Sequence, residues 1–415
     1  MEKKQSSLSR RDFAKTSAAA GFAILASRSG RAQESAETLK IGLIGAGGRG
    51  CGAAVNCLTG NENVKLVALA DVFEESVIKA KVNLERNNDP RVKDKLAIED
   101  ELCFSGLDAY QKLLETDVDI VIHATPPYCR PMHLEAIVEA GKHLFSEKPF
   151  AVDSPGIRRC LAAAKVADEK GLTFVTGLQR RYQDKYIETV KKLQDGAIGK
   201  ILYGRAYWNG SLPFSHDREA GESDLAYRLR NWYNQIWTCG DSIVEQHVHN
   251  IDVINWVLDE YPTKVVANGG RAWKPAEEKY GDIWDNFACD YEYASGARML
   301  SMSRHWNNSK SDVWERVVGT EKESTCGEMG RDRSDPYVNE HIAMLESIRG
   351  DRERINDGER TAYATLTAIM GREAAYTGQE VTWEQALNCE KSLVPADLDF
   401  EKEYPVGSIP VPGSE

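Results

Sequence analysis

Three side chains in this sequence have the types and the spacing to move protons in a reaction. Lys148 lies just beyond the apolar run 143–146, which is typical of a buried parallel strand. Ligands of parallel sheets bind at the carboxyl ends of strands, where an ammonium group can stabilise charge on a substrate oxygen; a solvated lysine is the alternative. Glu245 and His249 lie four residues apart in one predicted helix, 241–257, so they share a face. A carboxylate there can hold an imidazole in one tautomer and present its other nitrogen to a substrate. The sequence therefore predicts Lys148, His249 and Glu245 as catalytic residues and leaves the proton acceptor undecided between Lys148 and His249.

The same Glu–His spacing could also bind a metal ion, but too few ligands lie nearby. His247 points about 160° away from Glu245 on a helical projection, so it cannot join Glu245 and His249 around one ion. A zinc site needs three or four ligands, and the nine cysteines of the chain include no CxxC pair. We therefore predict no metal site and interpret His247 as a packed or supporting residue.

A glycine-rich turn near the start of the chain has the spacing of a dinucleotide-binding loop. A short apolar run leads directly into residues 45–50, GAGGRG, and a helical stretch follows. In such a unit Gly45 permits the tight turn, Gly47 lets the backbone approach a pyrophosphate, and Gly50 lets the helix pack on the strand. Asp71 ends the next strand 21 residues after Gly50, where an acidic residue accepts a hydrogen bond from a ribose 2′-hydroxyl. No basic residue follows Asp71 at once, so the sequence predicts NAD as the cofactor rather than NADP.

The surrounding pattern predicts an α/β domain followed by an α+β domain. Short apolar runs alternate with helical stretches over residues 38–178, which is typical of a Rossmann doubly wound parallel sheet. Extended runs at 200–208, 264–273, 286–293 and 298–304 then lie close together within 179–385, with helices grouped elsewhere, which predicts an open, mostly antiparallel sheet. Because one face of such a sheet needs cover, we expect a homo-oligomer, either a dimer or a tetramer. Residues 386–415 show little periodicity, and we expect a C-terminal arm or a loose tail.

Polar and aromatic side chains at and after the domain junction are candidates for binding a substrate. Arg180, Arg181 and Tyr182 follow the last predicted strand of the first domain, where guanidinium groups could hold a phosphate, a carboxylate or sugar hydroxyls. Solvated arginines are the alternative. Trp232 lies in a segment that mixes aromatic and basic residues, as pockets for sugars often do, although it could equally anchor a loop. We predict Arg180, Arg181, Tyr182, Trp232 and His249 as substrate-binding residues.

Charge and composition exclude several classes of partner. The 415-residue chain carries a formal net charge of −12, which opposes binding to nucleic acid or to an anionic membrane surface. No apolar run reaches the roughly 20 residues of a membrane-spanning helix. Arg10 and Arg11 precede a short apolar stretch and small residues at 30–32, which is typical of a twin-arginine export signal over residues 1–32. We therefore expect an exported, periplasmic protein, with a frayed basic N-terminus as the alternative.

Together these motifs resemble those of the glucose–fructose oxidoreductase / inositol dehydrogenase (Gfo/Idh/MocA) superfamily of sugar dehydrogenases. The resemblance covers roughly residues 38–380 and is strongest at 45–50, Asp71, Thr125-Pro126, Glu147-Lys148-Pro149 and 241–252. It implies NAD contacts by Gly45, Gly47, Arg49, Gly50, Asp71, Thr125, Pro126, Glu147 and Lys148. It also implies catalysis by Lys148 and His249. The family usually has aspartate where this chain has Glu245, so the carboxylate lies one methylene further from the backbone.

The resemblance implies a reversible hydride transfer between nicotinamide and a hydroxyl-bearing carbon of a sugar, polyol or sugar derivative. His249 or Lys148 would take the hydroxyl proton, and Glu245 would orient His249. Some members oxidise a sugar transiently, eliminate the aglycone and reduce the product with retained NAD, so a glycoside hydrolase or lyase is the alternative. Export away from an NADH pool favours this alternative, whereas Lys148, which the glycosidase members tend to lack, disfavours it. A nucleotide-binding sensor without turnover is a third reading, which the presence of all three catalytic candidates disfavours.

Overall fold

The first domain is built on a parallel sheet of six strands. The computed structural model describes residues 37–413, so the export signal predicted at 1–32 lies outside the described residues. Within the described chain the strands stand in the order β3-β2-β1-β4-β5-β6, and every neighbouring pair is parallel. The strands are β1 (Leu39–Ile44), β2 (Val64–Asp71), β3 (Cys103–Ser105), β4 (Ile120–His123), β5 (His143–Ser146) and β6 (Phe174–Thr176). This order is that of a dinucleotide-binding fold and confirms the doubly wound sheet that the sequence predicted.

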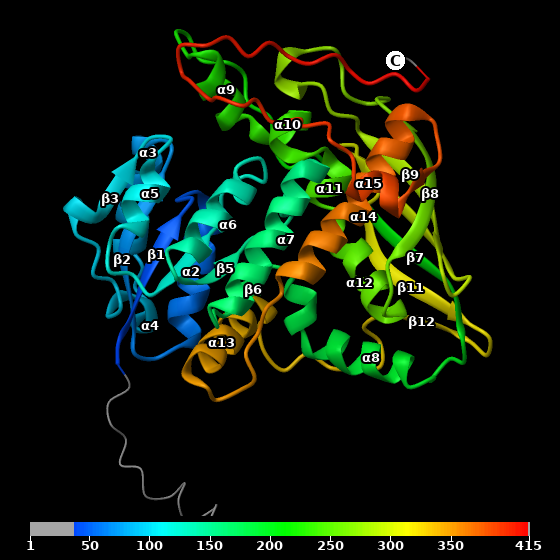
Figure 1. The fold of residues 1–415 in the computed structure, drawn as a ribbon, viewed down its shortest axis with the longest axis horizontal. Helices are drawn as coiled ribbons and strands as arrows, with labels where there is room; N and C mark the ends of the chain where they lie inside the picture. The colour runs from blue at the N-terminus through cyan, green and yellow to red at the C-terminus, as the bar shows by residue number, and fades with distance from the viewer. Residues whose placement is uncertain (1–36, 414–415) are drawn as a thin grey trace, which may run out of the picture. The chain divides into compact units, whose positions relative to one another are not determined.

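Helices cover both faces of this sheet (Figure 1), which is why its strands are apolar on both sides. Ile41 and Ile120 pack in one buried cluster with residues of α2, while Val121 and Leu144 pack in another with residues of α6 and α7. The helices are α2 (Gly48–Gly60), α3 (Glu74–Glu85), α4 (Pro90–Lys93), α5 (Ala109–Leu114), α6 (Arg130–Glu139) and α7 (Ser154–Glu169). β3 escaped prediction because three residues are too few to show a hydrophobic period.

The second domain is built on a sheet of seven strands among the described residues. Their order is β12-β11-β7-β10-β9-β8-β13; β10 and β7 are parallel and the other pairs are antiparallel. The strands are β7 (Ile201–Gly210), β8 (Pro262–Gly270), β9 (Asn286–Tyr293), β10 (Arg298–His305), β11 (Asp312–Gly319), β12 (Glu323–Thr325) and β13 (Val381–Thr382). The sequence predicted β7 to β10 and missed β11, β12 and β13. The expected α+β domain with a mostly antiparallel sheet is confirmed.

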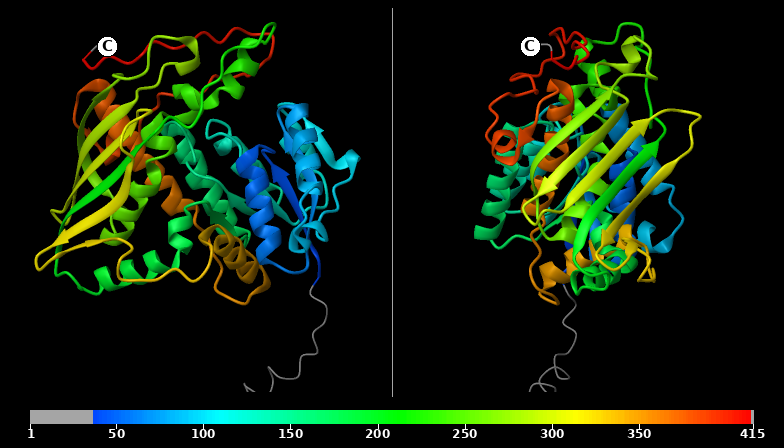
Figure 2. Two further views of the ribbon diagram at one scale, coloured as in Figure 1. Left: turned by 180° about the vertical axis from the view of Figure 1, so that it is seen from behind. Right: turned by 90° about the vertical axis from the view of Figure 1, so that its right-hand side faces the viewer.

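One face of this second sheet is covered by helices and the other is open. Helices α12 (Val248–Leu258) and α14 (Gly358–Thr377) pack on the covered face, and α8 (Asp184–Gln194) packs on α12. The right-hand view of Figure 2 shows the opposite face, over which no helix of the described chain lies. Tyr207 and Trp314 lie on that open face with ring centroids 4.4 Å apart.

A late segment of the chain returns to the first domain. Helix α13 (Pro336–Arg349) follows the second sheet but packs against α2. A Cβ on Gly60 of α2 would lie only 2.7 Å from Val338 and 2.9 Å from Ile342, so the absence of a side chain at Gly60 lets the two helices pack closely. A segment that follows the boundary expected near residue 179 therefore packs on the first domain, so the two domains are not separate in space along that boundary.

The C-terminal segment is docked as an arm. After α15 (Trp383–Leu387) it runs beside α9 (Asp224–Arg230), as the red trace in Figure 1 shows. The backbone N–H of Leu393 donates to Asp153 at 2.7 Å. The backbone N–H of Tyr404 donates to Asp224 at 2.8 Å. Residues 393–404 are thus bonded to both domains.

Candidate active site

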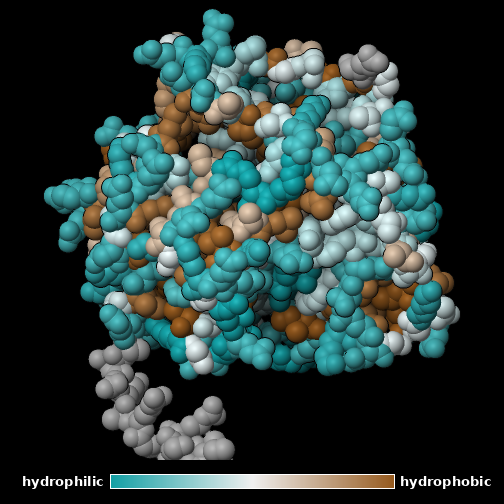
Figure 3. Space-filling view, viewed as in Figure 1, coloured by the Kyte–Doolittle hydropathy of each residue, from teal (hydrophilic) through white to brown (hydrophobic). Residues whose placement is uncertain are grey.

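A cavity of about 1190 Å³ lies where loops of both domains meet the C-terminal arm. It begins at the carboxyl ends of the first sheet's strands, the usual ligand site of such folds. Figure 3 shows apolar side chains around a hollow beneath α9, in the upper left of that view. All of the residues that the sequence linked to the cofactor line this cavity: Gly45, Gly47, Arg49, Gly50, Asp71, Thr125, Pro126, Glu147 and Lys148.

The glycine loop has the geometry of a phosphate cradle. Gly45 has φ +93°, a left-handed conformation that favours glycine. A Cβ on Gly50 would lie 1.9 Å from the carbonyl oxygen of Gly45, so the helix start can approach the strand only without a side chain. At Gly47 and Gly48 a Cβ would meet nothing within 4 Å, which leaves open space beside the N-terminus of α2. A pyrophosphate fits this space, because free N–H groups at a helix N-terminus bind anions.

Asp71 is held next to this loop. Its Oδ2 accepts a hydrogen bond from the backbone N–H of Ala46 at 2.8 Å, and its Oδ1 accepts one from Phe73 at 3.0 Å. Burial raises the pKa of this carboxyl group. Because each carboxylate oxygen has two acceptor positions, Asp71 can still accept from a ribose hydroxyl in the cavity. The glycine loop and Asp71 therefore fit a dinucleotide.

Glu147 ties the glycine loop to the catalytic lysine candidate. Its Oε1 accepts a hydrogen bond from Nε of Arg49, and its Oε2 accepts one from the backbone N–H of Lys148 at 3.2 Å. A Cβ on Gly177, just after β6, would lie 2.6 Å from Glu147 Oε2, so a side chain there would displace the Glu147 carboxylate. Glu147 is 5% exposed, and it acts as a positioning residue.

Lys148 and Glu245 form a buried ion pair in the cavity wall. The lysine Nζ donates to the carboxylate Oε1 of Glu245 at 3.0 Å and to the backbone oxygen of the same residue at 2.6 Å. The two side chains are 9% and 7% exposed. We expected Glu245 to orient His249, but the carboxylate instead holds Lys148.

The segment that carries Glu245 and His249 is not one helix, contrary to the prediction. Helix α11 (Ser242–Glu245) ends before α12 begins at Val248. The N–H of His247 bonds to the carbonyl oxygen of Ser242, five residues back, at 3.3 Å. This widened turn interrupts the helix, and such turns are frequent at functional sites. The break carries Glu245 towards Lys148, which helical spacing alone cannot show.

His249 stands beside the ion pair with a free nitrogen. Its ring lies over Trp208 with centroids 6.0 Å apart, and both residues line the cavity. Its buried Nδ1 has no hydrogen-bond partner among the described residues. Burial, and next the nearby Lys148 ammonium, hold the pKa of His249 well below its ordinary value, so the imidazole is neutral at pH 7.

Three predicted substrate-binding residues lie outside the cavity. Each binds a carboxylate of the second domain: Arg180 to Glu315 at 2.7 Å, Arg181 to Asp252 at 2.7 Å and 2.9 Å, and Tyr182 to Asp357 at 2.6 Å. The cavity lining therefore gives no support to the predicted substrate role of Arg180, Arg181 and Tyr182. The carboxylates come from segments 70 or more residues away in sequence, which local composition cannot reveal.

Trp232 and His249 line the cavity as predicted, together with residues that the sequence did not indicate. The missed residues include Trp208, Phe214, Tyr233, Tyr337 and the arm segment 392–398. Tyr233 could have been found as the neighbour of Trp232. Leu398, Phe400 and Tyr404 give the arm an apolar spacing that indicates docking, and Leu398 and Phe400 pack with Tyr404. Phe214 lies in a loop and carries no sequence signal.

Metal-binding and membrane-spanning features are absent from the described part of the chain. In residues 37–413 no three His, Cys, Asp or Glu side chains are grouped to hold a metal ion. Over the same residues no helix has both the length and the apolar character to cross a membrane. His247 is fully buried, and its Nε2 lies 2.7 Å from the hydroxyl oxygen of Ser301 in β10, so it is a packed residue.

Family profiles match both domains. The profile of an oxidoreductase family with an NAD-binding Rossmann fold, GFO/IDH/MocA, matches residues 39–178. The profile of the GFO/IDH/MocA C-terminal domain matches residues 186–323. The chain belongs to the GFO/IDH/MocA oxidoreductase family. The resemblance seen in the motifs is thus confirmed, and so is NAD as the cofactor of the first domain.

Individual members of this family show the same relation. The scyllo-inositol 2-dehydrogenase (NAD(+)) of Bacillus subtilis is 24% identical over 311 residues, covering 72% of this chain and 82% of the relative. The 2,7-anhydro-N-acetylneuraminate hydratase of Mediterraneibacter gnavus is 26% identical over 265 residues, covering 62% and 65%. The structure of scyllo-inositol dehydrogenase from Lactobacillus casei with NAD(H) and scyllo-inositol superposes with a TM-score of 0.64 at 21% identity, covering 84% and 100%. This last likeness shows the shared fold.

Proposed function

We propose that this oxidoreductase is a dehydrogenase that transfers a hydride between NAD and a hydroxyl-bearing carbon of a sugar, polyol or sugar derivative. The observation that carries the proposal is the buried Lys148–Glu245 pair beside His249, in the cavity that also contains the glycine loop. The inositol dehydrogenases among the relatives support a polyhydroxylated substrate.

In the proposed reaction one side chain stabilises the developing negative charge and another accepts the proton. Bound NAD⁺ supplies the hydride acceptor. Two hydrogen bonds to Glu245 fix the ammonium group of Lys148, which has one further donor for a substrate oxygen. His249 is neutral and lines the cavity, so its imidazole takes the hydroxyl proton. Lys148 stabilises the alkoxide charge that develops, and Glu245 is a positioning residue for Lys148.

The direct test is NADH formation. Purified protein is mixed with NAD⁺ and a panel of sugars, polyols and aryl glycosides, and absorbance is followed at 340 nm. We expect NADH to accumulate with one class of substrate, and a Lys148→Met variant to lose the activity. Full activity of that variant on the same substrate would refute the role of Lys148. A flat trace with every compound, from protein shown to hold NAD, would refute the dehydrogenase.

A second candidate is a glycoside hydrolase or lyase that oxidises its sugar transiently and keeps its NAD. The observation that favours it is the arm segment 392–398, which lines the same cavity as Asp71 and would have to move for a bound cofactor to leave past it. A hydratase among the relatives also carries out a reaction without net redox change. Aglycone release with no change at 340 nm would support this candidate over the dehydrogenase.

We also propose that the open face of the second sheet binds a further copy of this chain. Tyr207, Leu300, Met302 and Trp314 lie on this face, a concentration of large apolar side chains that favours association. Analytical ultracentrifugation tests this: we expect a dimer or tetramer, and a Trp314→Asp variant that dissociates. A monomeric wild-type protein would contradict the proposal.

Export remains a proposal that rests on residues 1–32 alone. Replacing Arg10 and Arg11 with lysine should retain the full-length protein in the cytoplasm. Fractionation of cells that express the wild-type and variant chains measures this. Equal periplasmic amounts of both would contradict a twin-arginine signal.

A further inference from the structure

Three aromatic side chains extend the cavity beyond the catalytic pair. Phe214, Trp232 and Tyr233, which we call the aromatic wall, all line the cavity together with Lys148 and Glu245. Their ring centroids are 5.5–5.8 Å apart, with interplanar angles of 58–65°, so the rings interlock edge to face. Phe214 and Trp232 remain partly exposed, and they therefore offer apolar ring surface to an occupant of the cavity.

The aromatic wall is adjacent to the position where the reacting ring must lie. Tyr233 is 1% exposed, and the Glu245 carboxylate is close enough to contribute to raising its pKa. The hydroxyl oxygen of Tyr233 and Oε2 of Glu245 are both buried, and they lie beside each other. The tyrosine of the aromatic wall therefore adjoins the Lys148–Glu245 pair, which places the wall next to the reacting ring.

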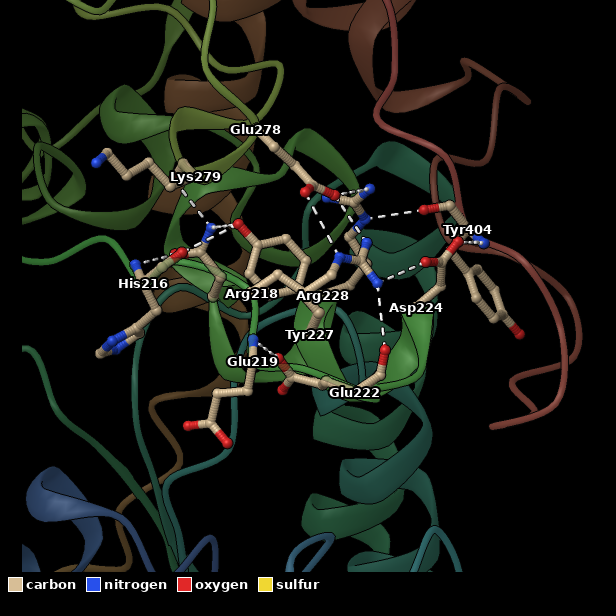
Figure 4. Close-up of polar contacts among 11 residues, drawn as sticks. His216, Arg218, Glu219, Glu222, Asp224, Tyr227, Arg228, Glu278, Lys279 and Tyr404 are labelled. Carbon is tan, nitrogen blue, oxygen red and sulfur yellow. Dashed lines mark hydrogen bonds and ion pairs between the residues drawn. The ribbon is translucent and has the colours of Figure 1, made fainter.

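The loop that carries Phe214 is held by hydrogen bonds and ion pairs, and those of its later part, from His216 onward, are drawn in Figure 4. The carbonyl oxygen of Phe214 accepts from Asn234 at 3.0 Å, so the loop is bonded directly to the neighbour of Tyr233. Further along the loop, Arg218 lies 2.7 Å from both Asp224 and Glu278. These bonds fix the aromatic wall before any ligand arrives, which lowers the entropic cost of binding.

The same network connects the wall to the C-terminal arm. Arg228 is 1% exposed; its Nε donates to the carbonyl oxygen of Tyr404 at 2.8 Å, and its Nη2 donates to Glu278 at 3.3 Å. The buried guanidinium group of Arg228 therefore bonds both to the C-terminal arm and to the network that holds the Phe214 loop, so this end of the cavity is ordered by internal contacts.

The size of the cavity leaves room at this end. Pockets for single small molecules usually measure about 300–1,000 Å³, and this cavity measures about 1190 Å³. A dinucleotide takes the end at the glycine loop, and one reacting ring takes the space at Lys148. The aromatic wall then remains for a second ring.

We propose that the aromatic wall is a subsite for a second ring, so that the substrate is a sugar joined to another sugar or to an aromatic group. The reacting ring lies against Lys148 and His249, and the attached ring packs on Trp232 and Phe214. The proposal rests on the proposed function for its account of the reacting ring. The subsite itself is defined by binding and can be tested separately.

The test compares methyl and phenyl glycosides of the same sugars by titration calorimetry on the NAD-loaded protein. Glucose, galactose, mannose and N-acetylglucosamine supply the reacting ring. We expect at least one phenyl glycoside to bind tenfold or more tightly than its methyl counterpart. In Trp232→Ala the preference should fall to about one, and Phe214→Ala on the surface loop provides the same test where Trp232→Ala fails to fold. Trp273→Ala, which removes an aromatic side chain outside the cavity, should keep the preference.

The outcomes separate the subsite from the proposed function. Equal binding of methyl and phenyl glycosides, binding of neither series, or a preference that survives both wall variants would overturn the subsite. NADH formation with free sugars as efficient as with phenyl glycosides would also overturn it, while leaving the dehydrogenase intact. A phenyl preference that depends on Trp232, without NADH formation from any compound, would support the subsite and overturn the dehydrogenase.

Discussion

Replacing Lys148 with methionine should destabilise the protein as well as inactivate it. The substitution leaves the Glu245 carboxylate without its cation where the two side chains are only 9% and 7% exposed. At the Nζ–Oε1 distance of 3.0 Å and an effective dielectric constant of about 20, the lost attraction is about 5.5 kcal/mol. Relaxation around the carboxylate recovers part of this energy. We therefore expect the free energy of unfolding to fall by about 3 kcal/mol.

A second substitution distinguishes lost charge pairing from lost packing. In the double variant Lys148→Met/Glu245→Gln neither position of the pair carries a charge, so its free energy of unfolding should lie about 2 kcal/mol above that of Lys148→Met. Both variants should lose turnover by about 100-fold or more, because neither has the ammonium group. A double variant that is more stable than Lys148→Met but equally inactive would show that the pair contributes to stability through its charges and to activity through the ammonium group.

Urea unfolding followed by tryptophan fluorescence measures these differences. Lys185→Met provides the control, because Lys185 pairs with Asp332 at 3.0 Å but the two side chains are 37% and 38% exposed. That change should cost less than about 1 kcal/mol. Equal stability of Lys148→Met and Lys185→Met, or a double variant no more stable than Lys148→Met, would refute the buried-pair reasoning.

Three further predictions follow from individual contacts. Burial lowers the pKa of His341 from 6.5 to about 3, so the unfolded chain binds a proton at this residue more tightly than the folded chain and the free energy of unfolding falls as the pH drops below 6.5. Between pH 7 and pH 5.5 the free energy of unfolding of His341→Met, measured by urea titration, should therefore fall by about 1 kcal/mol less than that of the wild type. Equal falls in both proteins would contradict this reasoning. Gly177→Ala places a Cβ 2.6 Å from Glu147 Oε2, which should displace the Glu147 carboxylate from Arg49. The affinity for NAD, measured by fluorescence titration, should then fall about tenfold. An unchanged affinity would show that Glu147 has room to move without leaving Arg49. Asp71→Asn replaces an acceptor of the ribose hydroxyl, so NAD affinity should fall about tenfold in the same titration, and an unchanged affinity would place the ribose elsewhere.

The first domain was predictable because its signals are local. Residues 45–50 and Asp71 belong to one strand–turn–helix–strand unit, in which each residue's role follows from spacing along a short segment. Buried parallel strands also give continuous apolar runs, and β1, β2, β4 and β5 were found in this way. The three-residue β3 has no such run.

The catalytic geometry was less predictable because it depends on contacts between distant segments. Lys148 and Glu245 are 97 residues apart, and only the interrupted turn before α12 brings the carboxylate to the ammonium group. Helical spacing paired Glu245 with His249 instead. The sequence likewise indicated that Arg181 was available to bind an anion. In the structure Arg181 pairs with Asp252, which is 71 residues away in the chain.

The docked C-terminal arm has a consequence for how the protein is made. Residues 392–398 line the same cavity as Asp71, yet they leave the ribosome more than 300 residues later. The cofactor pocket therefore cannot close during synthesis of the first domain; it is completed only after residues 392–404 have been synthesised and have docked against Asp153 and Asp224. Loss of residues 389–413 would thus leave a folded first sheet with an unfinished pocket.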